Sequence, residues 1–207
     1  MATGTDLILS FELYVDDSTE LSTEEEFALL NKIYRKVLIN RPWEFLKKSW
    51  DTTTDGNNYL ALPSDFSYFL ENQNYSDNSI GTDIAQSPKA IIVNGNPWKI
   101  VNWSDRRQYE NNNVCYIDAR TLRLYFANTP ASGLTVSADY IYKPDDITST
   151  TSPVLPIAHE MIYHGMAVDD MITQIFDKAR SYAPENQAKY DSYMRDLAYH
   201  NSQFINL

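Results

Sequence analysis

Two histidines and a glutamate lie close together in the segment LPIAHEMIYHG, which contains His159, Glu160 and His164. A zinc peptidase helix carries the motif His-Glu-x-x-His, whose histidines are four residues apart and bind one ion from the same face. His159 and His164 are five residues apart, so on an α-helix their imidazoles would be offset by about 140°. Zinc also needs further ligands, and the other histidine of the chain is His200. We therefore predict an ordinary helix without metal.

The other nucleophilic and acidic groups form no catalytic motif that we recognise. Cys115 stands alone in the sequence, within a predicted strand where it would pack as a small hydrophobe. A lone cysteine forms no internal disulfide, which fits assembly in a reducing compartment. The acid pairs at 145–146 and 169–170 are sequence neighbours, and neighbours on a helix do not face each other. We predict no enzyme activity and no cofactor.

Two residue groups leave alternatives open. Arg106 and Arg107 in the segment SDRRQYE have the charge to bind a phosphate, but a solvated turn in which Asp105 pairs with them is favoured. The chain also has 15 tyrosines, which either complete the core and its rim or serve subunit contacts, where tyrosine is enriched.

The charge balance disfavours a nucleic-acid-binding function. The chain carries 17 basic and 28 acidic residues, a formal net charge of −11, whereas a protein that grips phosphates needs the opposite sign. Six of the acids lie in DDSTELSTEEE, residues 16–26, where acids at a helix start complement the helix dipole. No apolar run is long enough to span a bilayer, and MATGTDLILSF has no basic region before its apolar stretch, so we expect no signal peptide.

Helical patterns occupy both ends of the chain. Apolar residues recur at helical spacing from Leu7 to Val15, and again from Phe27 to Leu38 after the capping-box pair Ser22 and Glu25. The PWEFLKK segment predicts a further helical turn. Towards the C-terminus, helices are predicted from Pro156 to about Tyr182 and from Pro184 onward.

The middle of the chain has the period of β-strands. AIIVNGNPWKIVN predicts a hairpin with Asn94-Gly95 at its tip, because this pair accepts positive φ angles. VCYIDARTLRLYFAN predicts two strands joined by a tight turn, and GLTVSADYIYK alternates so that Val136 and Tyr140 face one side. NNYLALPSDF predicts a strand followed by a helical turn at 66–70, and residues 74–88 predict a loop.

These patterns predict an α+β fold in which both chain ends build one helical bundle and a small antiparallel β domain is inserted between them. The expected parts are N-terminal bundle helices at 1–50, the β domain at 51–148, and C-terminal bundle helices with a tail at 149–207. Residues 143–156, which contain three prolines and many hydroxyls, would be the linker.

The order of these segments resembles a known family. LYVDDSTELSTEEEFALLNKIYRKVLINRPWEFL is similar to the start of head-to-tail adaptor (connector) proteins of tailed bacteriophages, including the tubular protein A type of short-tailed phages. YLALPSDFSYFLE and LRLYFANTPASGLTVSADYIYKPDDIT resemble their strand elements, and LPIAHEMIYHGMAVDDM and KYDSYMRDL resemble their later helices. The likeness covers nearly the whole chain and consists of structural patterns in the same order.

The resemblance implies a structural protein of the virion neck or tail region, assembled in the host cytoplasm. It implies a homo-oligomeric ring, a dodecamer, docked under the portal protein and contacting the next tail component, a nozzle or tail tube. Double-stranded DNA would pass through the lumen without specific binding, which an acidic lumen favours. No membrane partner is implied.

The C-terminal NSQFINL would carry the portal contact, with Phe204, Ile205 and Leu207 as apolar docking residues. Intramolecular packing or fraying of this tail is the alternative. The helix-sheet-helix order also suits another neck or tail protein, such as a stopper or a tail terminator. A metal-dependent hydrolase would require zinc at His159 or His164.

Overall fold

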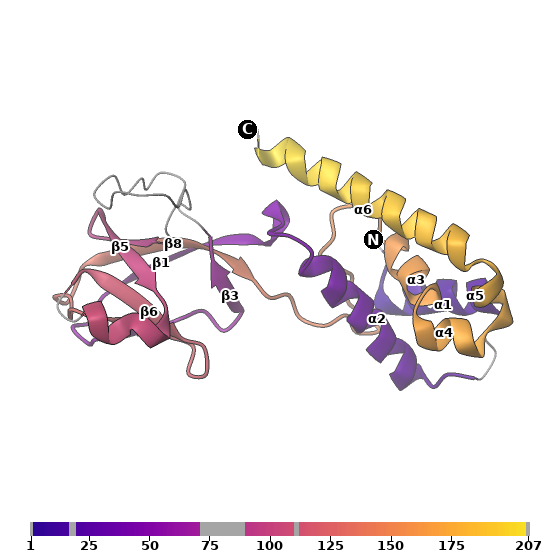
Figure 1. Ribbon diagram of the computed structural model, residues 1–207, viewed down its shortest axis with the longest axis horizontal. Helices are drawn as coiled ribbons and strands as arrows, with labels where there is room; N and C mark the ends of the chain where they lie inside the picture. The colour runs from indigo at the N-terminus through magenta and orange to yellow at the C-terminus, as the bar shows by residue number, and fades with distance from the viewer. Residues whose placement is uncertain (1, 17–19, 71–89, 110–111, 206–207) are drawn as a thin grey trace. The chain divides into compact units, whose positions relative to one another are not determined.

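The computed structural model describes residues 2–16, 20–70, 90–109 and 112–205 (Figure 1). The chain divides into two compact units. The helical unit comprises Met1–Phe45 and Pro144–Leu207, and the β unit comprises Leu46–Lys143. Helices from both chain ends with an inserted, mostly antiparallel sheet make a mixed α+β fold, so the predicted fold class is confirmed.

The first two helices begin at capping boxes. Helix α1 (Gly4–Val15) starts after Thr3, whose side chain accepts a hydrogen bond from the Asp6 amide while the Asp6 carboxylate accepts one from the Thr3 amide. Helix α2 (Thr23–Leu38) repeats the arrangement with Ser22 and Glu25, as the sequence predicts. These boxes satisfy amide groups that the first turn of a helix otherwise leaves unpaired.

The single helix predicted from Pro156 to about Tyr182 is wrong. The structure has three short helices there, α3 (Glu160–Ala167), α4 (Asp170–Ile175) and α5 (Asp177–Ser181). Asp169 is extended and its side chain caps α4 by accepting from the Met171 amide at 3.3 Å. Phe176 is also extended, and its ring is buried. A local cap and the burial of one aromatic ring therefore override the helical periodicity.

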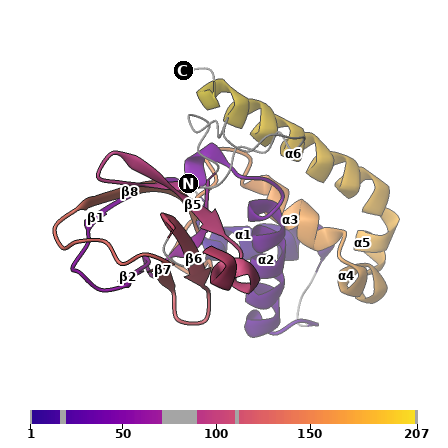
Figure 2. The same cartoon turned by 60° about the vertical axis from the view of Figure 1, so that its left-hand side comes forward.

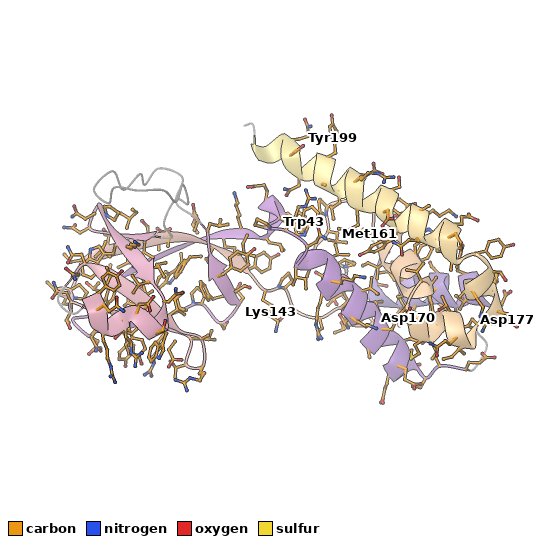
Figure 3. All side chains as sticks on the ribbon, in the orientation of Figure 1. Trp43, Lys143, Met161, Asp170, Asp177 and Tyr199 are labelled. Atoms are coloured by element: carbon orange, nitrogen blue, oxygen red, sulfur yellow. The ribbon has the colours of Figure 1, made fainter. Side chains whose placement is uncertain are left out.

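Helix α3 is the centre of the helical unit. It packs against α1 and α2 on one side and against the long helix α6 (Ala183–Ile205) on the other, as Figures 1 and 2 show. Gly165 allows this approach, because a Cβ placed there would lie 2.6 Å from Ile33 Cγ2 and 3.0 Å from the Tyr190 ring. Met161, labelled in Figure 3, is fully buried at this centre. Other buried hydrophobic residues of the helical unit include Leu7, Phe11, Leu30, Val37, Ile162, Met166, Ile172 and Leu197.

The segment that follows the β unit is held against the N-terminal helices by polar bonds. The buried side-chain amide of Asn31 in α2 donates to the Ile147 carbonyl at 3.0 Å and accepts from the Ile147 amide at 2.7 Å. The Gly4 amide donates to the Thr151 carbonyl at 2.9 Å, and the Val154 amide donates to the Tyr34 hydroxyl at 3.1 Å. The two ends of the chain thus belong to one folded body.

The β unit is built on one sheet. Its strands are β1 (Lys47–Thr53), β2 (Tyr59–Ala61), β3 (Phe66–Phe69), β4 (Ala90–Val93), β5 (Asn96–Val101), β6 (Val114–Asp118), β7 (Arg123–Phe126) and β8 (Thr135–Tyr142). The order is β1-β8-β4-β5-β6-β7-β2, and β3 also pairs with β8. All pairs are antiparallel except β5 with β6, which are parallel. The 3₁₀ helix η2 (Trp103–Tyr109) lies in the connection that a parallel pair requires.

Four local predictions in and next to the β unit have different outcomes. The Asn94-Gly95 hairpin between β4 and β5 is confirmed, with φ angles of 49° and 79°. The helical turn predicted at 66–70 is wrong, because Phe66–Phe69 form β3. Pairing with β8 buries the ring of Phe69 in the core, and this tertiary contact decides the local structure. The loop predicted at 74–88 lies outside the described residues. The helical turn predicted for PWEFLKK is a 3₁₀ helix, η1 (Glu44–Leu46), and Lys47 already begins β1.

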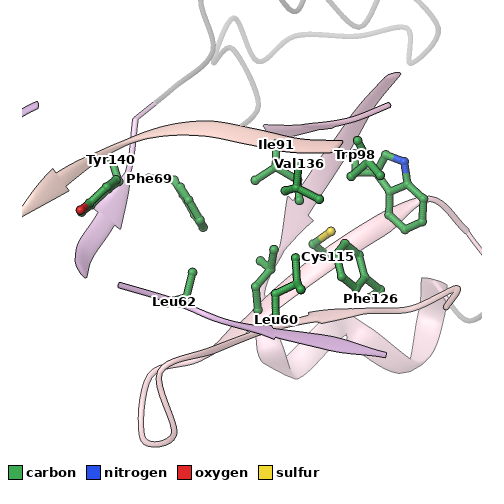
Figure 4. Close-up of a cluster of buried hydrophobic side chains, with 11 residues drawn as sticks. Leu60, Leu62, Phe69, Ile91, Trp98, Cys115, Phe126, Val136 and Tyr140 are labelled. Carbon is green, nitrogen blue, oxygen red and sulfur yellow. The ribbon is translucent and has the colours of Figure 1, made fainter. Parts of the chain in front are cut away.

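One face of the sheet encloses the hydrophobic core drawn in Figure 4. Val136 and Tyr140 both contribute to it, so the alternation predicted for β8 is confirmed. Alternate residues of an antiparallel strand point to opposite faces, which leaves the intervening side chains on the outer face. The core residues are Leu60, Leu62, Phe69, Ile91, Val93, Trp98, Cys115, Leu124, Phe126, Val136 and Tyr140.

Replacing Asn31 should destabilise the protein strongly. Asn31→Ala leaves the buried amide and carbonyl of Ile147 without their side-chain partner, at a cost of about 2–4 kcal/mol in unfolding free energy. Urea denaturation measures it. The matched control is Arg35→Ala, which removes the exposed ion pair with Asp146 in the same segment and should cost less than about 1 kcal/mol. Equal losses for the two variants would contradict the assigned role of Asn31.

Candidate functional site

The two histidines of the LPIAHEMIYHG segment serve different parts of the structure. His159 precedes the first residue of α3, and its Nε2 donates to the Leu155 carbonyl at 2.8 Å. His164 is buried, and its Nδ1 donates to Asn186 Oδ1 in α6 at 3.0 Å. Within the described residues, no group of three or more His, Cys, Asp or Glu side chains is arranged to hold a metal ion.

His164 instead joins three helices through aromatic contacts. Its ring lies 4.3 Å from Tyr163 in α3, 5.5 Å from Tyr14 in α1 and 5.9 Å from Tyr193 in α6, measured between ring centroids. Burial lowers the pKa of His164 below its ordinary value, and the hydrogen bond with Asn186 opposes that shift in part. A buried neutral imidazole with these neighbours is a packing element.

The β unit contains two chemically distinctive groups, neither of which is activated. Cys115 is fully buried in the core, and burial raises the pKa of its thiol well above the ordinary range. The Tyr140 hydroxyl donates to Asp65 Oδ1 at 2.9 Å, and Lys48 Nζ lies 2.6 Å from the same carboxylate. Burial and this hydrogen bond raise the pKa of Tyr140 to about 12. The thiol and the phenol therefore stay protonated at neutral pH, as expected for structural groups.

The outer face of the sheet carries a continuous row of aromatic rings. Tyr125 in β7 is paired with Tyr59 in β2 and with Tyr116 in β6, and the rings of Tyr116 and Tyr125 are stacked within 5° at 5.6 Å. Trp103 in η2 meets Tyr116 edge-on at 5.3 Å. We call these four residues the aromatic row.

An arginine lies over each end of the aromatic row. The Arg106 guanidinium is 4.2 Å from the centre of the Trp103 ring, and the Arg123 guanidinium is 4.3 Å from that of Tyr59. Trp103 is 37% exposed, and the three tyrosines are partly exposed. Tyrosine, tryptophan and arginine are the residues that most often dominate protein–protein binding. The aromatic row is therefore the best-formed candidate interaction surface of the β unit.

The sequence interpretation only partly anticipated this surface. Arg106 belongs to a 3₁₀ helix in which its guanidinium also donates to the Trp103 carbonyl at 2.6 Å. The sequence signal was present in β6 and β7, where tyrosines alternate with the core residues Cys115 and Leu124. The contact between η2 and the sheet depends on the parallel β5–β6 pairing, which was not predicted.

The predicted docking residues lie at the end of α6. Phe204 and Ile205 belong to the final turn of that helix, which ends at Ile205. Leu207 lies outside the described residues. None of the helices that the structure describes is both long enough and apolar enough to cross a membrane.

Comparison with protein families gives a match over nearly the whole chain. The model of a family described as SU10 adaptor protein matches residues 2–204, a range that includes both units. Comparison with curated proteins gives no match.

His164 should make stability depend on pH. Because its pKa is lowered in the folded state, the unfolded chain binds the proton more tightly, and stability falls as the pH drops below the ordinary histidine pKa of about 6.5. His164→Gln, which can still donate to Asn186, should flatten the unfolding free energy between about pH 7.5 and about pH 5. Urea titrations across that range measure the slope, and parallel profiles for the two proteins would refute the assignment.

Proposed function

The chain belongs to the SU10 adaptor protein family, which makes it a bacteriophage adaptor and a structural component of the virion, and we propose that it is the ring that joins head to tail. In this proposal twelve copies dock under the portal protein. The finer resemblance to the tubular protein A type of short-tailed phages stays a prediction. The observation that carries the proposal is the family match across residues 2–204. The helical body closed from both chain ends agrees with it, because such a body can present an inserted module to a second component.

The two units would have different partners. The helical unit forms the ring, and the last turn of α6 with the residues after it reaches the portal. The β unit faces the next tail component, a nozzle or tail tube, through the aromatic row. Stacked tyrosines at adjacent cross-strand positions form a stiff surface, so little side-chain entropy would be lost on binding.

The charge distribution supports a DNA channel without specific contacts. The helical unit contains 8 basic and 18 acidic residues, so the net charge of −11 belongs almost entirely to it. A lumen lined by an acidic body repels phosphates, and DNA leaves the head without being retained.

The assembly state should depend on the portal. We expect the purified chain to be monomeric or weakly associated alone, and to form rings when mixed with portal, as measured by light scattering and negative-stain images. Deletion of residues 204–207 should reduce portal-bound rings at least tenfold without changing the circular dichroism spectrum. A labelled chain found at the far end of the tail, and never at the neck, would contradict the proposal.

Removing rings from the aromatic row should weaken only the contact with the tail. The double substitution Tyr116→Ala and Tyr125→Ala removes two adjacent rings from the centre of the surface, and we expect affinity for the next tail component to fall about 30-fold or more. The matched control is Tyr199→Ala, because Tyr199 is 71% exposed on α6 in the helical unit (Figure 3). Surface plasmon resonance compares them, and a similar loss for the control would argue against the row as the binding surface.

A further inference from the structure

One end of the aromatic row carries a cation that has no carboxylate partner among the described residues. The Arg106 guanidinium lies over the Trp103 ring and donates to the Trp103 carbonyl. The adjacent Asp105 carboxylate accepts from the Ser104 hydroxyl at 2.9 Å instead. The pairing of Asp105 with the arginines of η2 that the sequence favoured is therefore not formed in the described part of η2. Arg107, which is exposed, adds a second cation here.

The other end of the row has a similar arrangement. Arg123 in β7 lies over the Tyr59 ring, and Asp118 in β6 is its cross-strand neighbour. The Asp118 side chain is only 12% exposed and pairs with Arg120 at 3.3 Å. Arg123 is thus left without an ion pair in the part of the chain that the structure describes. Hydrogen bonding with Tyr125 raises the pKa of the Arg123 guanidinium, so this cation is fully charged.

An arginine held over a ring keeps donor groups available for a partner. The guanidinium fork has several N–H donors, and its geometry matches both oxygens of a carboxylate. Because contact with the ring already restricts the side chain, less rotamer entropy is lost when a partner binds. Arg106 and Arg123 are both half-buried, and an ion pair formed at such a position is screened by salt less than a fully exposed one.

The row between the two arginines is uncharged. Tyr116 and Tyr125 occupy its centre, with their rings stacked within 5° of each other. Aromatic rings of this kind bury apolar or aromatic side chains of a partner. The surface therefore fits a segment in which carboxylates lie on both sides of an apolar or aromatic stretch.

A single strand of nucleic acid fits this surface less well. Bases stack on free ring faces, but one face of Trp103 and one face of Tyr59 are already covered by arginines. A nucleic-acid strand also carries a charge at every nucleotide and is bound by an excess of cations. The β unit has no excess of basic over acidic residues. A protein segment with a few suitably placed carboxylates is thus the better match.

We propose that the aromatic row binds an acidic protein segment of the next tail component, with one carboxylate at the Arg106 end, another at the Arg123 end, and apolar or aromatic side chains over the tyrosines between them. The inference rests on the proposed contact between the β unit and the tail, and it identifies the chemistry of the partner surface. Single-stranded DNA and a second copy of this chain, whose helical unit is acidic, are the competing occupants that the test separates.

Removing the two charges while keeping the rings tests this assignment. One variant of the full chain carries Arg106→Gln and Arg123→Gln, and another carries Arg106→Glu and Arg123→Glu. By surface plasmon resonance, we expect affinity for the purified tail component to fall about tenfold for the first and about 100-fold for the second. Circular dichroism and urea midpoints check that each variant folds.

The matched control changes two cations of the helical unit. Lys36 and Arg195 are exposed and form no ion pair with a residue that the structure describes. The double substitution Lys36→Glu and Arg195→Glu makes the same change in net charge as the reversal in the β unit. It should bind the tail component as the unchanged chain does, and an equal loss would show a net-charge effect and overturn the inference.

A zero-length cross-link identifies the partner groups directly. The variant with Arg106→Lys and Arg123→Lys keeps both charges and supplies primary amines, which a carbodiimide couples to carboxylates in ion-pair contact. We expect new amide links from positions 106 and 123 to Asp or Glu side chains of the tail component, located by mass spectrometry. The unchanged chain is the control, because guanidinium groups do not form these links.

The outcomes separate the partner chemistry from the proposed function. If Tyr116→Ala with Tyr125→Ala abolishes tail binding and neither arginine variant weakens it, the row remains the contact and the acidic partner is overturned. Links from positions 106 and 123 to another copy of this chain would also overturn it, as would oligothymidylate binding that is tighter than tail binding and is lost with the tyrosine substitutions. If none of these substitutions weakens tail binding while assemblies still form on the portal, the β-unit contact and this inference both fail and the proposed ring stands.

Discussion

The helical unit depends on one buried amide. Asn31 satisfies both backbone groups of Ile147 and so attaches the chain that returns from the β unit to the helix that precedes it. The pairing is enforced by burial, since an unpaired amide or carbonyl in this position would cost more than the bond itself contributes. Gly4 adds to the constraint, because a Cβ there would lie 2.2 Å from the Thr148 carbonyl oxygen. These contacts couple the N-terminal helices to the returning segment.

In the β unit, the two-residue alternation of the strands produces both the core face and the outer aromatic face of the sheet. Along β6 and β7, every second side chain enters the core, and the residues between them are tyrosines that stack across strands. The alternation that buries Leu124 in the core therefore places Tyr125 on the outer face of the sheet. Interior packing and the outward aromatic surface are consequences of a single register, so a shift of one residue would exchange them.

Much of this fold can be predicted from the sequence because the signals are local. A few neighbouring residues are enough to predict three of its features. These are the start of α2 from Ser22 and Glu25, the Asn94-Gly95 turn, and the alternation of β8. The incorrect secondary-structure predictions concern residues whose local structure is decided by tertiary contacts. The sequence around Phe69 predicts a helical turn, but pairing with β8 makes it a strand. Phe176 interrupts a predicted helix because its ring is buried. The aromatic row could not be predicted for the same reason, because Trp103 contacts Tyr116 only when η2 packs on the sheet.

The β unit leaves and rejoins the helices through neighbouring strands. Lys47, at the start of β1, lies opposite Ile141 near the end of β8. The entry and exit of this module are thus held together by its own backbone hydrogen bonds, and no long connection has to bridge them. An insertion with such closely spaced ends behaves as a cassette. A sheet of different shape inserted between these two positions would leave the residues that close the helical body unchanged.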